Sequence, residues 1–161
     1  MTTCTAARGD ATHRCVIMDA TVARPYTYTR RTSAEWLGAH GVHVRGEGAK
    51  PPLLVGREGE EEWTSLDLLL SAVESAIAFT FATLVEKHHL PVEAYYSETE
   101  ATVEMDDGAW RVARLVVRPT IILHDETTSA RVLKFVNVAV RECLIANTLS
   151  TSVIVEPTVK S

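Results

Sequence analysis

Cysteine is scarce in this chain, and its three cysteines form no recognisable set. Cys4, Cys15 and Cys143 make no Cys-x-x-Cys pair and no even-numbered framework of the kind that cross-links small secreted domains. Two of them fall within residues 1–22, a Thr/Ala-rich stretch with little periodicity that we expect to be a loose N-terminal arm. A reducing cytoplasm is the simplest compartment for such a chain.

Glycine and proline are also few, at 8 and 6 of 161 residues, which excludes fibrous and low-complexity chains. The formal net charge is −5 and no Lys/Arg run is interleaved with aromatics, so we expect neither a nucleic acid nor a membrane as partner. The chain starts without the basic and apolar segments of a secretory signal. No apolar run has the length of a membrane span, because residues 66–85 contain Asp67 and Glu74.

The composition instead indicates one globular domain, which we place at residues 23–161. Residues 26–29 and 42–45 alternate with the period of a strand, and residues 53–55 predict a further short strand. The acidic residues 56–62 predict a solvated loop.

A long helix is predicted next. Thr64 and Asp67 have the spacing of a capping box, and Pro91 ends the helical pattern. Apolar side chains occupy nearly the whole circumference between Leu66 and His89, a length of about 36 Å. One domain of this size cannot easily cover such a helix, so we expect a second subunit to cover part of it.

The rest of the chain predicts a hairpin, a second helix and a last strand. Asp107 and Gly108 supply the tight turn between strands over residues 92–105 and 109–124. The face of the return strand that we expect to be buried comprises Ala113, Leu115, Val117, Ile121 and Leu123. A helix over residues 127–146 carries an apolar stripe of Val132, Val136, Ala139, Val140 and Cys143, and residues 150–159 form a strand. This order predicts an α+β class with antiparallel sheets.

Two segments resemble the OsmC/Ohr family of osmotically inducible and organic hydroperoxide resistance proteins. Residues 63–72 (WTSLDLLLSA) look like the start of that family's central helix, and residues 141–149 (RECLIANTL) are similar to its segment in which a Cys precedes a short apolar stretch. The helix exit and the hairpin follow in the same order, so the resemblance spans about residues 26–158. It implies an OsmC-like fold and an intertwined homodimer with active sites at the subunit boundary.

The resemblance also implies that a reactive Cys reduces organic hydroperoxides, a second Cys resolves the sulfenic acid, and an Arg and a Glu tune the first thiol. The reactive Cys should lie eleven positions after Ser65, where this chain has Ala76, and none of residues 66–89 is Cys. The second Cys matches Cys143. No Arg closely follows Trp36, and the matching Glu is one of Glu58, Glu60, Glu61 and Glu62.

Our leading hypothesis is therefore an OsmC-like homodimer that lacks the peroxidatic Cys and has no peroxidase activity. Its pocket at the dimer boundary would suit a small apolar ligand or none, and the candidate lining residues are Ala76, Glu74, Phe79 and Glu58. We expect no cofactor and no metal, because His40-x-x-His43 and His88-His89 have no further ligands clustered with them.

Two alternatives stay open from the sequence. In one, Cys143 is catalytic: it alone attacks an organic hydroperoxide, and an external thiol resolves it. The inward-facing stripe that carries Cys143 favours a buried thiol instead. In the other, the chain is a dimerisation or accessory module without a ligand.

Overall fold

The computed structural model describes residues 28–37, 41–56, 62–124 and 128–161. The chain divides into two compact units, Met1–Arg31 and Thr32–Ser161, and the second contains all the helices and strands given below. The expected N-terminal arm and most of the acidic loop lie outside the described residues. The first described strand begins at Thr32 and not within residues 26–29, of which Tyr28 and Thr29 are described and lie outside any strand.

The first sheet has three short antiparallel strands in the order β1 (Thr32–Trp36), β2 (Val42–Gly46) and β3 (Leu53–Val55). The strands predicted at residues 42–45 and 53–55 are confirmed. Gly41 enters β2 with φ 91°, and a Cβ added there would lie 2.5 Å from the carbonyl oxygen of Val55. A glycine is therefore required where β2 turns in beside β3.

The predicted long helix is α1 (Ser65–His88). The Thr64 side chain accepts a hydrogen bond from the Asp67 N–H at 3.2 Å, and the Asp67 carboxylate accepts one from the Thr64 N–H at 2.8 Å, so the capping box is confirmed. The helix ends at His88 and is capped by His89, which takes a left-handed conformation with φ 50°. Its fully packed face consists of Val73, Ile77, Phe81 and Leu84.

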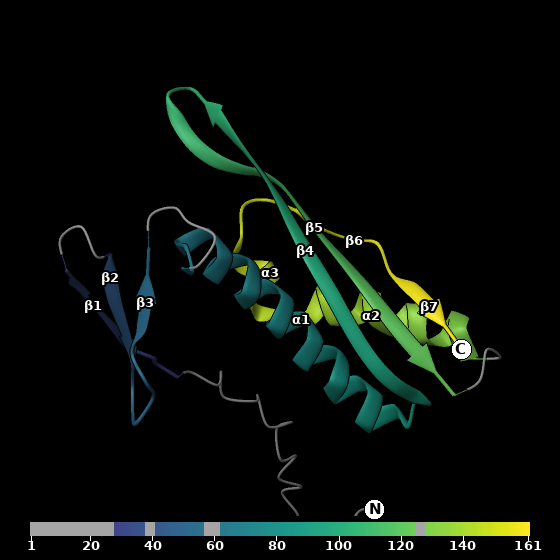
Figure 1. Cartoon of the computed structure of the whole chain (residues 1–161). Coiled ribbons are helices and arrows are strands. Elements are labelled where there is room, and N and C mark those ends of the chain that lie inside the picture. Colours follow the sequence, from purple (N-terminus) through teal and green to yellow (C-terminus); the bar gives the residue numbers. More distant parts are fainter. Residues whose placement is uncertain (1–27, 38–40, 57–61, 125–127) are drawn as a thin grey trace, which may run out of the picture. The chain divides into compact units, whose positions relative to one another are not determined.

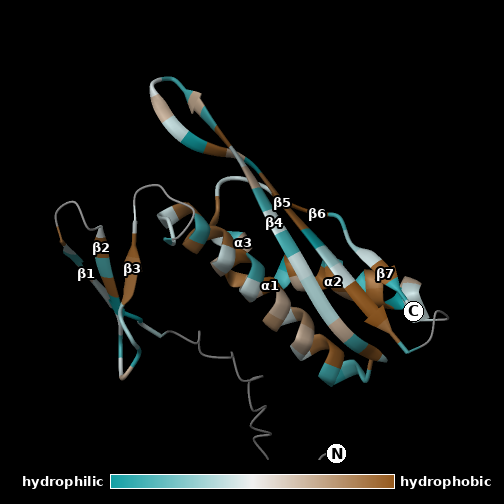
Figure 2. Ribbon diagram, in the orientation of Figure 1, coloured by the Kyte–Doolittle hydropathy of each residue, from teal (hydrophilic) through white to brown (hydrophobic). Residues whose placement is uncertain are grey.

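By length and composition α1 is also able to cross a membrane, contrary to the expectation that no apolar run is long enough. In the fold it packs against α2 (Ser129–Glu142) and β4 (Val92–Asp106) as a core helix. Figure 1 shows both helices along the hairpin that β4 forms with β5 (Ala109–Leu123). Figure 2 shows the most hydrophobic residues concentrated on α1, on β5 and on the short strands that follow α2.

The hairpin turn at Asp107 and Gly108 is confirmed, with φ 47° and 78°, the two positive values of a type I′ turn. The expected buried face of β5 is right for Leu115, Val117, Ile121 and Leu123 and wrong for Ala113. Thr102 pairs with Arg114 and Val103 with Val112, which leaves Ala113 unpaired in a bulge. The bulge shifts the alternation by one residue, so Val112 turns inward in its place.

The second predicted helix is broken into α2 and α3 (Leu144–Thr148). Cys143 has ψ 118°, which is extended backbone, and separates the two. The stripe is confirmed for Val132, Val136, Ala139 and Cys143, all buried, while Val140 is partly buried beside them.

The expected last strand is two strands, β6 (Val153–Val155) and β7 (Thr158–Lys160). The predicted α+β class with antiparallel pairing is confirmed for the first sheet and the β4–β5 hairpin, while β6 and β7 both pair with β5 in parallel. The physical reason is that α2 and α3 form a crossover, which returns the chain in the direction of β5. Pro119, which lacks an N–H, lies opposite the gap between the β6 and β7 ladders.

Candidate functional site

The structure brings together the two positions that the resemblance pairs, Ala76 and Cys143. A core cluster of Val73, Ile77, Leu115, Val117 and Cys143 joins α1, β5 and the junction of α2 with α3, and Ala76 packs against it. Ala76 and Cys143, 67 positions apart in the sequence, thus border one apolar region.

Cys143 is a free cysteine with no exposed surface. Its main chain is used structurally: its N–H donates to Val140 and its carbonyl accepts from Asn147. Its neighbours in the cluster are all apolar. Since thiol chemistry requires access to a thiolate, the surroundings of Cys143 fit a packing residue better than a nucleophile.

Glu74 and Phe79 lie on other sides of α1. The Glu74 carboxylate is partly buried and accepts a hydrogen bond of 2.6 Å from the hydroxyl of Ser97 on β4. Phe79 is 75% exposed. Glu58 lies outside the described residues, as do Cys4 and Cys15.

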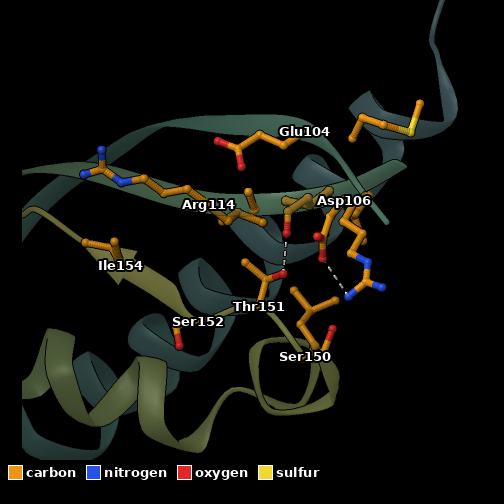
Figure 3. A pocket seen from close by; sticks show the side chains of 14 residues that line it. Glu104, Asp106, Arg114, Ser150, Thr151, Ser152 and Ile154 are labelled. Atoms are coloured by element: carbon orange, nitrogen blue, oxygen red, sulfur yellow. Dashed lines mark hydrogen bonds and ion pairs between the residues drawn. The ribbon is translucent and has the colours of Figure 1, made fainter. Parts of the chain in front are cut away.

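A hollow of about 800 Å³ lies between the turn end of the β4–β5 hairpin and the segment from α3 to β6 (Figure 3). Its apolar wall includes Leu115, Val112 and Leu149, which belong to or pack against the cluster of Cys143. Leu69 also lines it, and lies two helical turns before Ala76 on the same side of α1. The hollow and the region that Ala76 borders therefore share the side chains of Leu115, Val112 and Leu149, while Ala76 itself does not line the hollow.

The rim of the hollow is polar and carries charges of both signs. Arg111 pairs with Asp106 at 3.2 Å, and the rim also contains Glu104 of β4 and Arg114 of β5 (Figure 3). The Thr151 hydroxyl donates to the carbonyl of Val112, which ties the α3–β6 segment to the bulge. The sequence pattern did not predict this hollow, because its lining residues come from four separate segments of the chain. One of these segments is the bulged part of β5.

The other candidates that the structure describes are not among the residues that line the hollow. Arg45, the first arginine after Trp36 in the sequence, pairs with Glu35 at 3.5 Å within the β1–β2 pair. His88 stacks on Phe135 with a centroid separation of 4.5 Å. Within the described part of the chain no group of three or more His, Cys, Asp or Glu side chains could hold a metal ion.

Comparisons with known proteins agree with the resemblance. The family model described as OsmC-like protein matches residues 58–158. An OsmC-like protein of unknown function from Vibrio cholerae superposes with a TM-score of 0.74 at 16% identity, over 81% of this chain and 99% of that chain. An OsmC-like protein from Mycoplasma pneumoniae gives 0.73 at 12% identity, over 84% and 100%.

An organic hydroperoxide resistance protein from Elizabethkingia anophelis superposes with a TM-score of 0.68 at 11% identity, over 85% of this chain and 99% of that chain. No curated protein sequence matches the chain. At these identities the structural matches establish the fold, and the family model covers well over half of the sequence. The chain therefore belongs to the OsmC-like protein family.

Proposed function

We propose that this OsmC-like protein is a scaffold without peroxidase activity that binds a small apolar ligand beside Ala76. One observation carries the proposal: the position that the resemblance assigns to the reactive Cys is Ala76, at the edge of an apolar cluster. An alanine has no nucleophile to offer a peroxide. The hollow, whose wall includes Leu115 of the same cluster, supplies space with an apolar wall and a polar rim, which suits a small ligand.

The alternative, catalysis by Cys143 alone, finds less support. Its sulfur is fully buried among apolar side chains, so an organic hydroperoxide would reach it only after the core opened. The peroxide consumption assay described below distinguishes catalysis by Cys143 from the absence of peroxidase activity.

The proposal includes a homodimer. Phe79 is 75% exposed at the middle of α1, and every residue of β1 is exposed, including Trp36 at 74%. Exposed aromatic surface of this extent is typical of an interface between subunits. Phe79→Glu should raise the dissociation constant of the dimer at least tenfold in analytical ultracentrifugation, while Lys134→Glu, on an exposed position of α2, should leave it unchanged.

The proposed lack of peroxidase activity is tested by following organic hydroperoxide consumption with a dithiol reductant. The unsubstituted protein and Cys143→Ala should both show no turnover. Ala76→Cys should gain turnover, because the new thiol would lie beside the cluster that holds Cys143. Ala76→Ser is the matched control, with a similar size and no thiol, and should stay inactive.

Ligand binding is tested separately with an apolar fluorescent probe. Ala76→Phe should reduce probe binding, since the larger side chain would fill the space at the edge of the cluster. Turnover by the unsubstituted protein that disappears in Cys143→Ala would overturn the proposal and assign the activity to Cys143. Equal probe binding by the unsubstituted protein and Ala76→Phe would reject the ligand site.

A further inference from the structure

A polar strip interrupts the apolar contact between α1 and β4. Glu74 is the one charged residue of α1 between Asp67 and Glu86. Its Oε1 accepts the hydrogen bond from the Ser97 hydroxyl at 2.6 Å, a short distance that is typical of a bond to a charged acceptor. A carboxylate is thus held against the middle of β4, in a helix that is otherwise packed through apolar residues.

Tyr95 and Thr99 flank Ser97 on the same face of β4. The three residues alternate along the strand and are partly buried, whereas Tyr96 and Glu98 between them are exposed. From the first to the last of the three, the strip extends about 13 Å along β4. It therefore places three hydroxyl groups on the side of the strand that faces Glu74.

Two of these hydroxyl groups are buried without a hydrogen-bond partner among the described residues: the Tyr95 hydroxyl and the Thr99 Oγ1. An unsatisfied buried polar group costs about 1–3 kcal/mol, and a role in binding a ligand or water is a common reason for one. Phenylalanine and valine would fill nearly the same volumes at these two positions without that cost. The strip therefore combines two unused hydroxyls with a carboxylate.

The charge of Glu74 is also uncompensated within the part of the chain that the structure describes, where no Lys, Arg or His lies within 4.0 Å of its carboxylate. The Tyr95 ring packs against Phe81 with a centroid separation of 5.5 Å, which adds aromatic surface near the strip. Burial has the largest effect and raises the pKa of Tyr95, a side-chain interaction with the Ser97 hydroxyl lowers it, and the charge of Glu74 raises it. Tyr95 is thus neutral at physiological pH, and its oxygen is available as an acceptor.

We infer that Glu74, Tyr95, Ser97 and Thr99 form a binding site for the ammonium group of a small protonated amine. An ammonium group has N–H donors for the carboxylate and for the two unpartnered hydroxyl oxygens. Its positive charge matches Glu74 and is attracted by the neighbouring aromatic rings. A carboxylate ligand would be repelled by Glu74, and an alcohol would leave the charge uncompensated.

This site does not depend on the proposed function. Glu74 precedes Ala76 by two residues, which places the two side chains about 200° apart around α1. The carboxylate points to β4, while Ala76 borders the cluster of Cys143. An amine at Glu74 and an apolar ligand at Ala76 would therefore occupy different sides of the helix.

The experiment compares n-butylamine, n-butanol and butyrate, which share a chain length and differ in the head group. Each is titrated into the full-length protein at pH 7 and constant ionic strength, and binding is followed by backbone amide shifts in two-dimensional NMR. Butylamine should bind saturably, with the largest shifts at residues 72–76 and 95–99. Butanol and butyrate should produce no saturable shifts there up to tens of millimolar.

Variants separate the charge from the hydroxyls. Glu74→Gln keeps an acceptor for Ser97 and should weaken butylamine binding about tenfold, the effect of 1.4 kcal/mol. Tyr95→Phe and Thr99→Val should each weaken binding several-fold while the unliganded protein keeps or gains thermal stability. Glu98→Gln, on the exposed face of the same strand, is the matched control and should bind butylamine like the unsubstituted protein.

Two results would overturn the inference. One is the absence of saturable butylamine shifts in the unsubstituted protein at tens of millimolar. The other is equal affinity of the unsubstituted protein and both Glu74→Gln and Tyr95→Phe. Since Tyr95→Phe removes only an unpartnered hydroxyl and should fold, the comparison stays decisive even if Glu74→Gln does not fold.

Discussion

Substitutions at Cys143 test whether its thiol is a packing group. Its side chain is fully buried among Val73, Ile77, Leu115 and Val117. Cys143→Ala removes one buried atom of the size of a methyl group and leaves a small cavity, which should cost about 1 kcal/mol of unfolding free energy. Cys143→Ser nearly keeps the volume but places a hydroxyl among apolar side chains, which should cost about 1–3 kcal/mol.

The unsubstituted protein should therefore be the most stable, followed by Cys143→Ala and then by Cys143→Ser. Urea unfolding followed by circular dichroism measures the difference, which should appear as a lower midpoint at an unchanged slope. For this reason Cys143→Ala, and not Cys143→Ser, is the suitable control in the peroxide assay. If Cys143→Ser lost activity, the result could come either from unfolding or from the loss of a nucleophile, and the assay would not distinguish the two.

Thiol labelling supplies the second measurement. In a background of Cys4→Ser and Cys15→Ser, Cys143 is the single thiol of the chain. It should react with a disulfide reagent slowly in the native protein and rapidly in denaturant, because its sulfur is shielded in the fold. Rapid native labelling, or a Cys143→Ser variant as stable as the unsubstituted protein, would refute the argument that Cys143 is a buried packing residue.

Three further predictions concern the helix cap, the first sheet and the pH dependence. Thr64→Ala should lower the unfolding free energy by about 1 kcal/mol and shorten α1 in amide exchange, because it removes the acceptor for the Asp67 N–H. Gly41→Ala should weaken the β2–β3 pairing, measured by amide exchange, since its φ of 91° and the nearby Val55 oxygen leave no place for a Cβ. The pKa of Tyr95 is raised in the folded protein, so above the ordinary value of 10.0 the Tyr95 hydroxyl loses its proton more readily in the unfolded chain. The free energy of unfolding, measured by urea titration, should therefore fall as the pH rises through this range. The free energy of unfolding of Tyr95→Phe should fall less steeply over that alkaline range.

The cap of α1 also has a pH dependence, of the opposite sign. The hydrogen bonds from Thr64 hold the pKa of Asp67 below its usual value, the side-chain bond contributing most. The Asp67 carboxylate therefore stabilises the fold at pH values above its pKa in the unfolded chain. This stabilisation is lost as the pH falls through its lower pKa in the folded protein. Thr64→Ala should make the acid unfolding profile shallower.

Features that depend on neighbouring residues could be predicted from the sequence alone. Thr64 and Asp67 specify a helix start within one turn, and Asp107-Gly108 specifies a hairpin because few residue pairs adopt two positive φ values. The apolar periodicity of α2 identified its buried face for the same reason. The motifs at residues 63–72 and 141–149 added the family, which the family model confirms over residues 58–158.

Features that depend on distant segments could be found only from the folded chain. The parallel pairing of β6 and β7 follows from the crossover through α2, and the bulge at Ala113 depends on the register with β4. The contact of Glu74 with Ser97 joins residues 23 positions apart, and the hollow is built from four segments. A local pattern carries no information on which distant strand lies opposite a side chain, because register and packing are set by the whole core at once.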